Sequence, residues 1–214
     1  MPKVVDHTER RREIASAVWR VLVREGLRGA SVRAVVAESG LSSGAIRYYF
    51  TSHDDLLRFA GHVVTERVPD RLGAVLRNRR VAARRRAALL LEELVPLDQQ
   101  RQTETRVFAA LADLDRSRPA DREFRRKAYD GCRVVARMAV LLLAGGEVTD
   151  EPSAALPPRQ ERLAERLQVV TDGLAGQYLF YPGLHTPAEM SRILRRAVDD
   201  VGDELAPEFV HLVP

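Results

Sequence analysis

Disulfide-forming residues, aromatic residues and long apolar runs are scarce in this 214-residue sequence. It has one cysteine (Cys132), one tryptophan and 6% aromatic residues. A single cysteine cannot form an intramolecular disulfide, which excludes the small disulfide-stabilised secreted class. The longest apolar runs, such as residues 138–144, are far shorter than the roughly 20 residues of a membrane-spanning helix. Because the N-terminus also lacks the apolar segment of a secretory signal, the cytoplasm is the expected location.

The sequence also lacks the residue patterns of common catalytic and metal sites. Its five histidines have no metal-ligand spacing with Cys132 or with carboxylates. No Ser/His/Asp arrangement and no phosphate-cradling glycine loop can be recognised. We therefore expect no metal, no cofactor and no enzymatic activity. Cys132 is interpreted as a buried helix residue, with redox sensing as the alternative.

Charge is plentiful but unevenly distributed along the chain. The formal net charge is +4, yet residues 1–86 carry 18 Lys and Arg against 9 Asp and Glu, whereas residues 87–214 carry 16 against 21. A basic N-terminal part joined to an acidic remainder indicates that the first part meets a polyanion. Arginine supplies 32 of the 34 basic residues. Since genome base composition also produces such a bias, arginine abundance alone identifies no binding site.

Helical periodicity runs through almost the whole chain, and no alternating strand pattern of useful length occurs. An apolar stripe formed by Ile14, Ala17, Val18, Val21 and Leu22 predicts a first helix. A capping box of residues 6 and 9 is expected to open this helix, and glycines 26 and 29 to end it. Longer helices are predicted from 52 towards 69, over 70–95 with a break near 78, and over 98–115, 121–144, 159–181 and 186–204.

Two short helices are predicted within residues 31–57, SVRAVVAESGLSSGAIRYYFTSHDDLL. Ser31 is placed to cap the first helix, Gly40 to end it and Ser42 to cap the second. Ser52 with Asp55 is placed to cap the helix that follows. Two short helices joined by a glycine-containing turn are typical of a helix-turn-helix, whose second helix lies in the DNA major groove. A helical hairpin inside an unrelated all-α domain is the alternative interpretation.

The same region carries a family resemblance. Residues 14–57 combine the first apolar stripe with Gly26, SVR at 31–33, SGLS at 39–42, Gly44, YF at 49–50, Ser52 and LL at 56–57. At this spacing the segment resembles the DNA-binding domain of TetR-type one-component repressors. Residues 91–97 (LEELVPL) and 172–174 (DGL) are similar to the choline-responsive BetI-like branch.

The resemblance implies an all-α fold of about nine to ten helices. A three-helix DNA-binding domain with the helix-turn-helix is expected at residues 1–52. A larger helical domain for effector binding and dimerisation is expected at residues 53–214.

A recognition helix must present short or hydrogen-bonding side chains at its N-terminus, because that end lies nearest the bases. Ser42 and Ser43 can hydrogen-bond phosphate or base edges, and Gly44 permits close backbone approach. One turn further, Arg47 has the planar fork that suits guanine. Phe50 is expected in the small core. The candidate DNA-binding residues are Ser31, Arg33, Ser42, Ser43, Gly44, Arg47, Tyr48, Tyr49 and His53.

Three of these positions depart from the usual pattern of the family. Ser43 stands where Lys or Arg is frequent, Arg47 where Tyr is frequent, and His53 where Lys commonly starts the fourth helix. Two lysine–phosphate contacts are therefore expected to be weaker, which would lower the salt dependence of DNA binding. Arg47 can compensate either by binding phosphate or by reading a base. A core or interface role is the alternative for Tyr48.

Two arginine-rich segments are also candidates for contact with nucleic acid. The run at residues 77–86 (RNRRVAARRR) is interpreted as a solvated helix face, since it lies outside the motif. Residues 10–12 are better placed, because the start of the first helix often lies near phosphate in this family.

The C-terminal part is expected to enclose a small-molecule effector and to pair with a second copy of the chain. The resemblance implies that the last two long helices form the interface of a homodimer. The candidate surface is a stripe of residues between 163 and 177, which follow one another at intervals of four and three. A choline-like ligand calls for an aromatic cage, and the long helices hold few aromatics, so choline specificity is not carried over. Candidate effector-lining residues are Phe108, Leu111, Tyr129, Cys132 and Met138; candidate dimer residues are Leu163, Leu167, Val170, Leu174 and Gln177.

These features predict a DNA-binding transcriptional regulator. The expected partners are double-stranded DNA with a pseudo-palindromic operator, a small-molecule effector and a second copy of the chain, without a membrane. Repression relieved by the effector is the predicted mode, and activation is the alternative within this class. An all-α enzyme or interaction scaffold without specific DNA binding is the alternative from another class.

Overall fold

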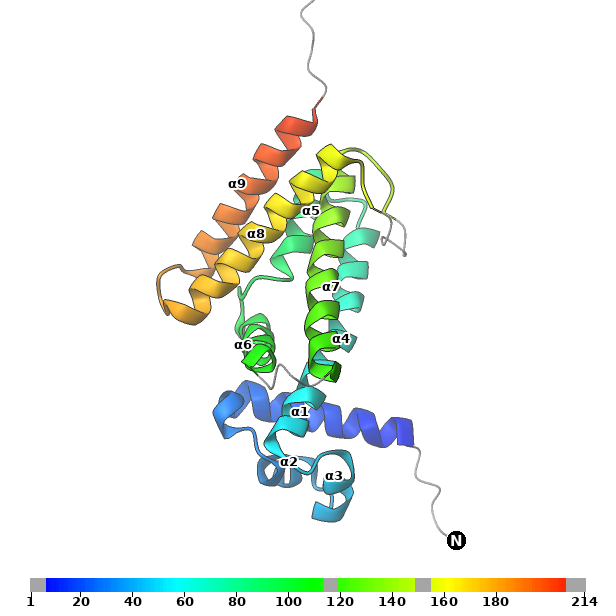
Figure 1. Ribbon diagram of the computed structural model, residues 1–214, viewed down its shortest axis with the longest axis vertical. Coiled ribbons are helices and arrows are strands. Elements are labelled where there is room, and N and C mark those ends of the chain that lie inside the picture. Colours follow the sequence, from blue (N-terminus) through cyan, green and yellow to red (C-terminus); the bar gives the residue numbers. More distant parts are fainter. Residues whose placement is uncertain (1–6, 114–118, 149–154, 207–214) are drawn as a thin grey trace, which may run out of the picture. The chain divides into compact units, whose positions relative to one another are not determined.

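The computed structural model describes residues 7–113, 119–148 and 155–206, and within these ranges every regular element is a helix. Figure 1 labels the helices in chain order. They are α1 (His7–Gly29), α2 (Val32–Ser39), α3 (Ser43–Tyr49), α4 (His53–Arg77), α5 (Ala83–Glu92), α6 (Gln99–Asp113), α7 (Pro119–Leu143), α8 (Pro158–Phe180) and α9 (Pro187–Leu205). The nine helices of the described ranges confirm the predicted all-α fold.

The chain divides into two compact units. The first comprises Met1–Asp70 and Asp98–Arg125, and the second comprises Arg71–Leu97 and Arg126–Pro214. Helices α4 and α7 each contribute residues to both units. The predicted boundary after residue 52 divides DNA binding from effector binding and dimerisation, which the two compact units do not test, so it stays a prediction.

The core of the first unit is built around α1. All five residues of the predicted stripe, from Ile14 to Leu22, are buried in one apolar cluster with side chains of α2, α3, α4 and α6. At Gly26 the backbone of α1 takes a φ of 68°, so the regular helix is interrupted there and the assigned helix extends to Gly29. The predicted stripe and the interruption at Gly26 are therefore confirmed. Asp6, the predicted capping residue of this helix, lies outside the described residues.

The predicted caps of the short helices are confirmed. Ser31 Oγ accepts a hydrogen bond from the backbone N–H of Ala34 (3.1 Å), and Ser42 Oγ accepts one from Ala45 (3.2 Å). Gly40 ends α2 in the left-handed conformation, with φ 68°. These interactions satisfy backbone groups that a short helix otherwise leaves unpaired at its ends.

Three predicted helix boundaries in the middle of the chain were wrong. Helix α4 continues through Pro69 to Arg77. Pro69 is exposed, so water can reach the carbonyl that loses its N–H partner, and the buried Leu72 anchors the helix beyond it. Helix α5 ends at Glu92 rather than at residue 95, and α7 begins at Pro119 rather than at 121, as suits proline in a first turn. The predicted break near Asn78 is confirmed.

In the second unit, α9 packs on both α5 and α8. Its start is the predicted capping box, in which Thr186 and Glu189 exchange side-chain to backbone hydrogen bonds. The carboxylate of Glu92, buried at the end of α5, accepts hydrogen bonds from Arg85 (2.8 Å) and from the hydroxyl of Ser191 on α9 (2.6 Å). Because Arg85 lies on α5 and Ser191 on α9, these hydrogen bonds tie the two helices together.

We predict that Gly40→Ala lowers the free energy of unfolding by about 1–2 kcal/mol, because an L side chain is disfavoured in the left-handed region. Nothing lies within 4 Å of the added Cβ, so the cost is conformational rather than steric. Gly44→Ala in the same unit is the matched control, since its Cβ meets only Ser42 Oγ at 4.0 Å in an ordinary helix. It should leave stability unchanged or raise it by up to about 1 kcal/mol. Urea unfolding measures both, and equal effects would contradict this account.

Candidate nucleic-acid interface

Helix α3 has an apolar inner face and a polar outer face. Ile46 and Phe50 are buried in the core of the first unit, as predicted for Phe50. Ser42, Ser43, Gly44, Arg47 and Tyr48 are all exposed, and the ring of Tyr48 is 77% accessible. The inner face therefore holds the helix on the unit while the outer face offers hydroxyls, a guanidinium and uncovered backbone.

The start of α2 offers a second group of polar side chains. Ser31 and Arg33 are both exposed at its first turn. The Ser31 oxygen already accepts the cap hydrogen bond, which leaves its hydroxyl proton available to donate. No residue in the described ranges pairs with the guanidinium of Arg33 or of Arg47. The N-terminus of a helix also favours an anion, so this region suits a phosphate.

Tyr49 and His53 differ from the other predicted residues. Tyr49 is half-buried, and its ring meets those of Tyr48 and Phe59 edge-on, with centroids 5.4 and 6.4 Å apart. Its ring thus helps to join α3 to α4. His53 begins α4, and its side chain lies outside the described part of the structure.

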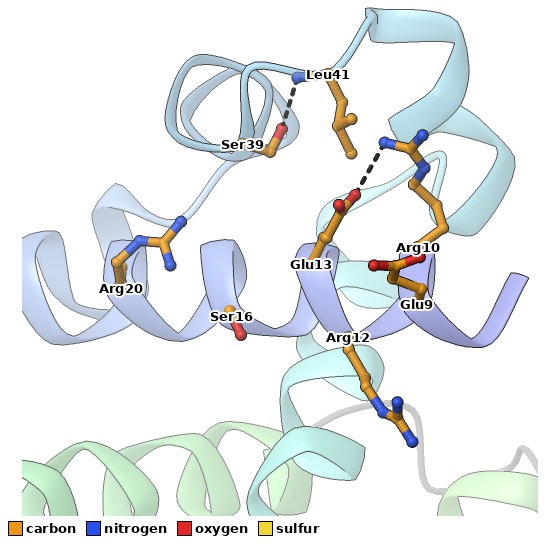
Figure 2. A pocket seen from close by; sticks show the side chains of 8 residues that line it. All are labelled: Glu9, Arg10, Arg12, Glu13, Ser16, Arg20, Ser39 and Leu41. Carbon is orange, nitrogen blue, oxygen red and sulfur yellow. Dashed lines mark hydrogen bonds and ion pairs between the residues drawn. The ribbon is translucent and has the colours of Figure 1, made fainter. Parts of the chain in front are cut away.

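An open groove of about 490 Å³ runs beside the start of α1 and the turn between α2 and α3 (Figure 2). Arg10 is paired with Glu13 at 2.9 Å, and Arg11 approaches Glu66 (3.9 Å) and lies over the ring of Phe59. Arginines 10 and 11 are therefore partly neutralised within the unit. The groove is lined by Glu9, Arg10, Arg12, Glu13, Ser16, Arg20, Ser39 and Leu41.

The five candidate effector residues fall in two separate units. Phe108 and Leu111 belong to the first, where Phe108 stacks on Phe124 and Leu111 is buried. Tyr129, Cys132 and Met138 belong to the second. The five are therefore not assembled into one pocket within either unit. Burial raises the pKa of the Cys132 thiol to about 11, which keeps it protonated at neutral pH and favours the inert interpretation.

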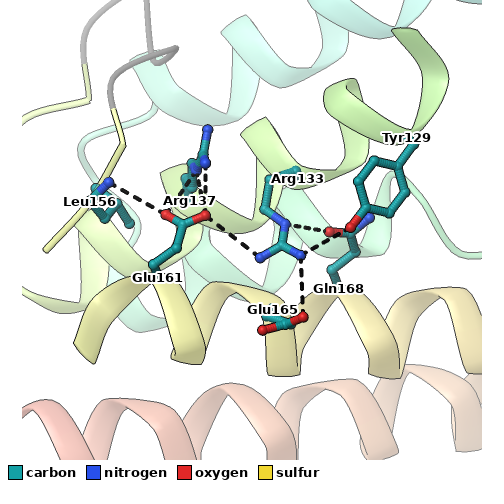
Figure 3. A network of polar contacts seen from close by, with 7 residues as sticks. All are labelled: Tyr129, Arg133, Arg137, Leu156, Glu161, Glu165 and Gln168. Carbon is teal, nitrogen blue, oxygen red and sulfur yellow. Dashed lines mark hydrogen bonds and ion pairs between the residues drawn. The ribbon is translucent and has the colours of Figure 1, made fainter. Parts of the chain in front are cut away.

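A polar network on α7 and α8 was not foreseen from the sequence (Figure 3). Arg133 donates to Gln168 Oε1 (2.6 Å) and to the hydroxyl of Tyr129 (3.2 Å). Arg137 donates through two nitrogens to Glu161, which holds the pKa of that carboxyl below its usual range. The four-residue spacing of Arg133 with Arg137, and of Glu161 with Glu165, predicts that each pair shares one face of its helix. It does not predict that these two faces lie against each other.

This network borders an open groove of about 480 Å³, lined by Tyr129, Asp130, Arg133, Val134, Arg137 and Glu161. The guanidinium groups of Arg133 and Arg137 pair with a carboxylate, an amide and a phenol of the same unit. The groove therefore presents paired charges rather than a free cation.

The predicted dimer stripe of α8 lies largely inside the second unit. Leu163, Leu167 and Leu174 are buried, and Val170 is half-buried. Gln177 is exposed, and its Oε1 lies 3.1 Å from Nε2 of His185. The stripe thus supplies core packing within the chain, and α8 exposes a different set of residues.

The exposed face of α8 is formed by Val169, Asp172, Gly173 and Phe180, and it includes the half-buried Gly176. Val169 and Phe180 are 64% and 76% accessible. A Cβ built on either glycine would meet no atom within 4 Å. Tyr181 and Leu184 in the turn after α8, and Ile193 on α9, are further exposed apolar side chains.

The described ranges hold neither a metal-ion site nor a membrane-spanning helix. No group of three or more His, Cys, Asp or Glu residues there could hold a metal ion. No helix among those residues has the length and apolar character needed to cross a bilayer.

Comparisons with known proteins agree with this architecture. Residues 14–59 match the family described as bacterial regulatory proteins, tetR family, and residues 83–203 match the family described as BetI-type transcriptional repressor, C-terminal. The HTH-type transcriptional regulator PksA of Bacillus subtilis (strain 168) is 30% identical over 201 residues, which cover 94% of each chain.

Solved structures share the fold across nearly the full length. A transcriptional regulator from Rhodococcus sp. Rha1 is 28% identical, with a TM-score of 0.67 and coverage of 91% of this chain and 96% of its own. A putative transcriptional regulator from Saccharomonospora viridis, in complex with choline, is 25% identical, with a TM-score of 0.70 and coverage of 90% and 97%. Both resemblances noted in the sequence are confirmed. The chain belongs to the TetR family of bacterial transcriptional regulators, with a C-terminal part of the BetI type, and is a regulator rather than an enzyme.

Proposed function

We propose that this protein represses transcription as a homodimer on a short pseudo-palindromic operator and leaves the DNA when a small molecule binds. The observation that carries the proposal is α3, whose inner face is buried while its outer face presents hydroxyls, backbone and a guanidinium with no partner among the described residues. Two such helices, related by a two-fold axis, would meet half-sites about 34–36 Å apart.

Seven of the nine predicted DNA-binding residues are assigned a role in this proposal, and Tyr49 and His53 stay candidate contacts. Ser42, Ser43 and Gly44 bring the start of α3 close to the base edges. Ser31 and Arg33 at the start of α2 bind backbone phosphate, as Tyr48 does with its phenolic hydroxyl. Arg47 reads a guanine, because its side chain is exposed and has no acidic partner in the described ranges. The part that meets DNA is proposed to be residues 1–52.

Dimerisation is proposed to use the exposed face of α8 together with α9, in place of the buried stripe. Gly173 and Gly176 would let a partner helix approach closely, while Val169 and Phe180 would bury apolar surface. Large apolar side chains exposed on one helix face favour association with another protein surface. A second copy completes the symmetry that a palindromic operator requires.

The effector site is proposed to lie in residues 53–214. Its candidate contacts are Phe108 and Leu111 if it lies in the first unit, and Tyr129, Cys132 and Met138 if it lies in the second. Leu111 and Met138 are buried, so a ligand that reaches them must displace core contacts. The Saccharomonospora viridis relative holds choline. An aromatic cage for such a cation is not proposed here, since Trp19 is buried on α1 beneath the guanidinium of Arg67. The cytoplasm is the proposed location.

Arg47→Ala tests the proposed base contact. If Arg47 binds guanine, the variant should lose about 1–3 kcal/mol at one operator position and become tolerant of any base there. Arg28→Ala, which removes another exposed charge, from the last turn of α1, is the matched control. Fluorescence anisotropy with single-substitution variants of a selected operator measures both. A uniform loss across the variants would assign Arg47 to phosphate, and no difference from Arg28→Ala would remove it from the interface.

Phe180→Asp tests the proposed dimer surface. We expect the variant to be monomeric at micromolar concentration, because a carboxylate would be buried without a partner at the interface. Tyr48→Asp is the matched control, since its ring is 77% accessible against 76% for Phe180, and it should remain dimeric. Sedimentation velocity measures both; a dimeric Phe180→Asp would contradict the proposed surface.

A further inference from the structure

The carboxylate of Glu38 joins α2 to α1 through two arginines. Its Oε1 accepts a hydrogen bond from Arg20 Nε and its Oε2 accepts one from Arg24 Nη1, each at 2.5 Å. Glu38 lies on α2, whereas both arginines lie on α1. Only 18% of the Glu38 side chain is accessible. We refer to these three side chains as the Glu38 clasp.

The Glu38 clasp lies at the C-terminal end of α2, just before the turn that leads into α3. In the next residue, Ser39 Oγ donates to the Val36 carbonyl (3.3 Å) and accepts from the Leu41 N–H (3.2 Å). Gly40 then reverses the chain direction, and Ser42 caps α3. Because only two residues separate the turn glycine from α3, an angular change at the end of α2 is passed on to the recognition helix.

A shared carboxylate is better suited to hold this angle than an isolated surface pair. Isolated exposed ion pairs contribute little to stability, and networks with restrained geometry contribute more than isolated pairs. Here both oxygens are engaged by separate guanidinium groups. The hydrogen bonds from Arg20 and Arg24 also hold the pKa of Glu38 below its usual range, so the clasp is charged at neutral pH.

We propose that Glu38 is a positioning residue for DNA recognition, which sets the orientation of α2 and α3 on α1. This inference rests on the proposed operator binding. Electrostatics alone argues against a carboxylate in this unit, because it repels phosphate and occupies two arginines that would otherwise attract it. The carboxylate favours binding only through the geometry that it holds.

Two charge-matched variants separate these effects. Glu38→Gln and Glu25→Gln each remove one negative charge beside Arg24, which also pairs with Glu25 at 2.9 Å. Glu25 lies on α1, so its loss leaves α2 unaffected. If charge alone mattered, both variants would bind DNA more tightly than the wild type. We predict that Glu38→Gln instead binds its operator about three- to tenfold more weakly, while Glu25→Gln shows no loss.

The readout is the ratio of affinities for operator and for scrambled DNA of equal length, measured by fluorescence anisotropy. A reduced folded fraction would lower both affinities equally and leave this ratio unchanged. A misplaced recognition helix lowers the ratio, because phosphate contacts tolerate the change better than base contacts. Arg20→Lys serves as a second variant, since it keeps the charge and removes the Nε donor, and its ratio should fall about twofold.

The outcomes are distinct. A ratio for Glu38→Gln equal to that for Glu25→Gln, with specific binding by the wild type, would overturn the clasp and leave the proposed function intact. A wild type that prefers no sequence would overturn the proposed function, and the clasp with it. A lower ratio for Glu38→Gln and for Arg20→Lys, with Glu25→Gln unchanged, is the result that supports the positioning role.

Discussion

The packing of α1 against two short helices is the interaction on which the DNA-binding surface depends. Helices of eight and seven residues, as in α2 and α3, are too short to be stable alone, since isolated helices under about 12–15 residues are marginal in water. Val35, Ile46 and Phe50 bury their side chains in the cluster that includes the α1 stripe. Each burial contributes about 1.5–3 kcal/mol. The polar outer face of α3 is therefore held by the apolar residues behind it.

The same cluster connects α3 to α4. The ring of Phe59 on α4 lies 6.4 Å from that of Tyr49 and 5.7 Å from that of Phe50, measured between centroids. The guanidinium of Arg11 covers Phe59 from α1. A shift of the first turns of α4 must therefore be accommodated by α3. A ligand that favours a conformation with such a shift would change the operator affinity by this route.

Local patterns predicted the elements well, whereas contacts between distant segments could not be predicted. The caps at Ser31 and Ser42 and the turn at Gly40 depend on neighbouring residues, so the sequence specified them. The α8 stripe satisfied helical periodicity, but periodicity does not say whether an apolar face meets its own chain or a partner. Pro69 was expected to end a helix, and solvent exposure allowed the helix to continue. The Arg137–Glu161 pair joins residues 24 apart, which no local pattern reveals.

The central claim is that the outer face of α3 binds DNA in a sequence-dependent way. The most direct test is the affinity of the wild-type protein for DNA upstream of its own gene, and for a scrambled control, across a series of salt concentrations. We predict a preference of at least about a thousandfold for the specific DNA. We also predict a logarithmic salt slope of several units, since each neutralised phosphate contributes nearly one. Equal affinity for both DNAs with no salt dependence would contradict the account.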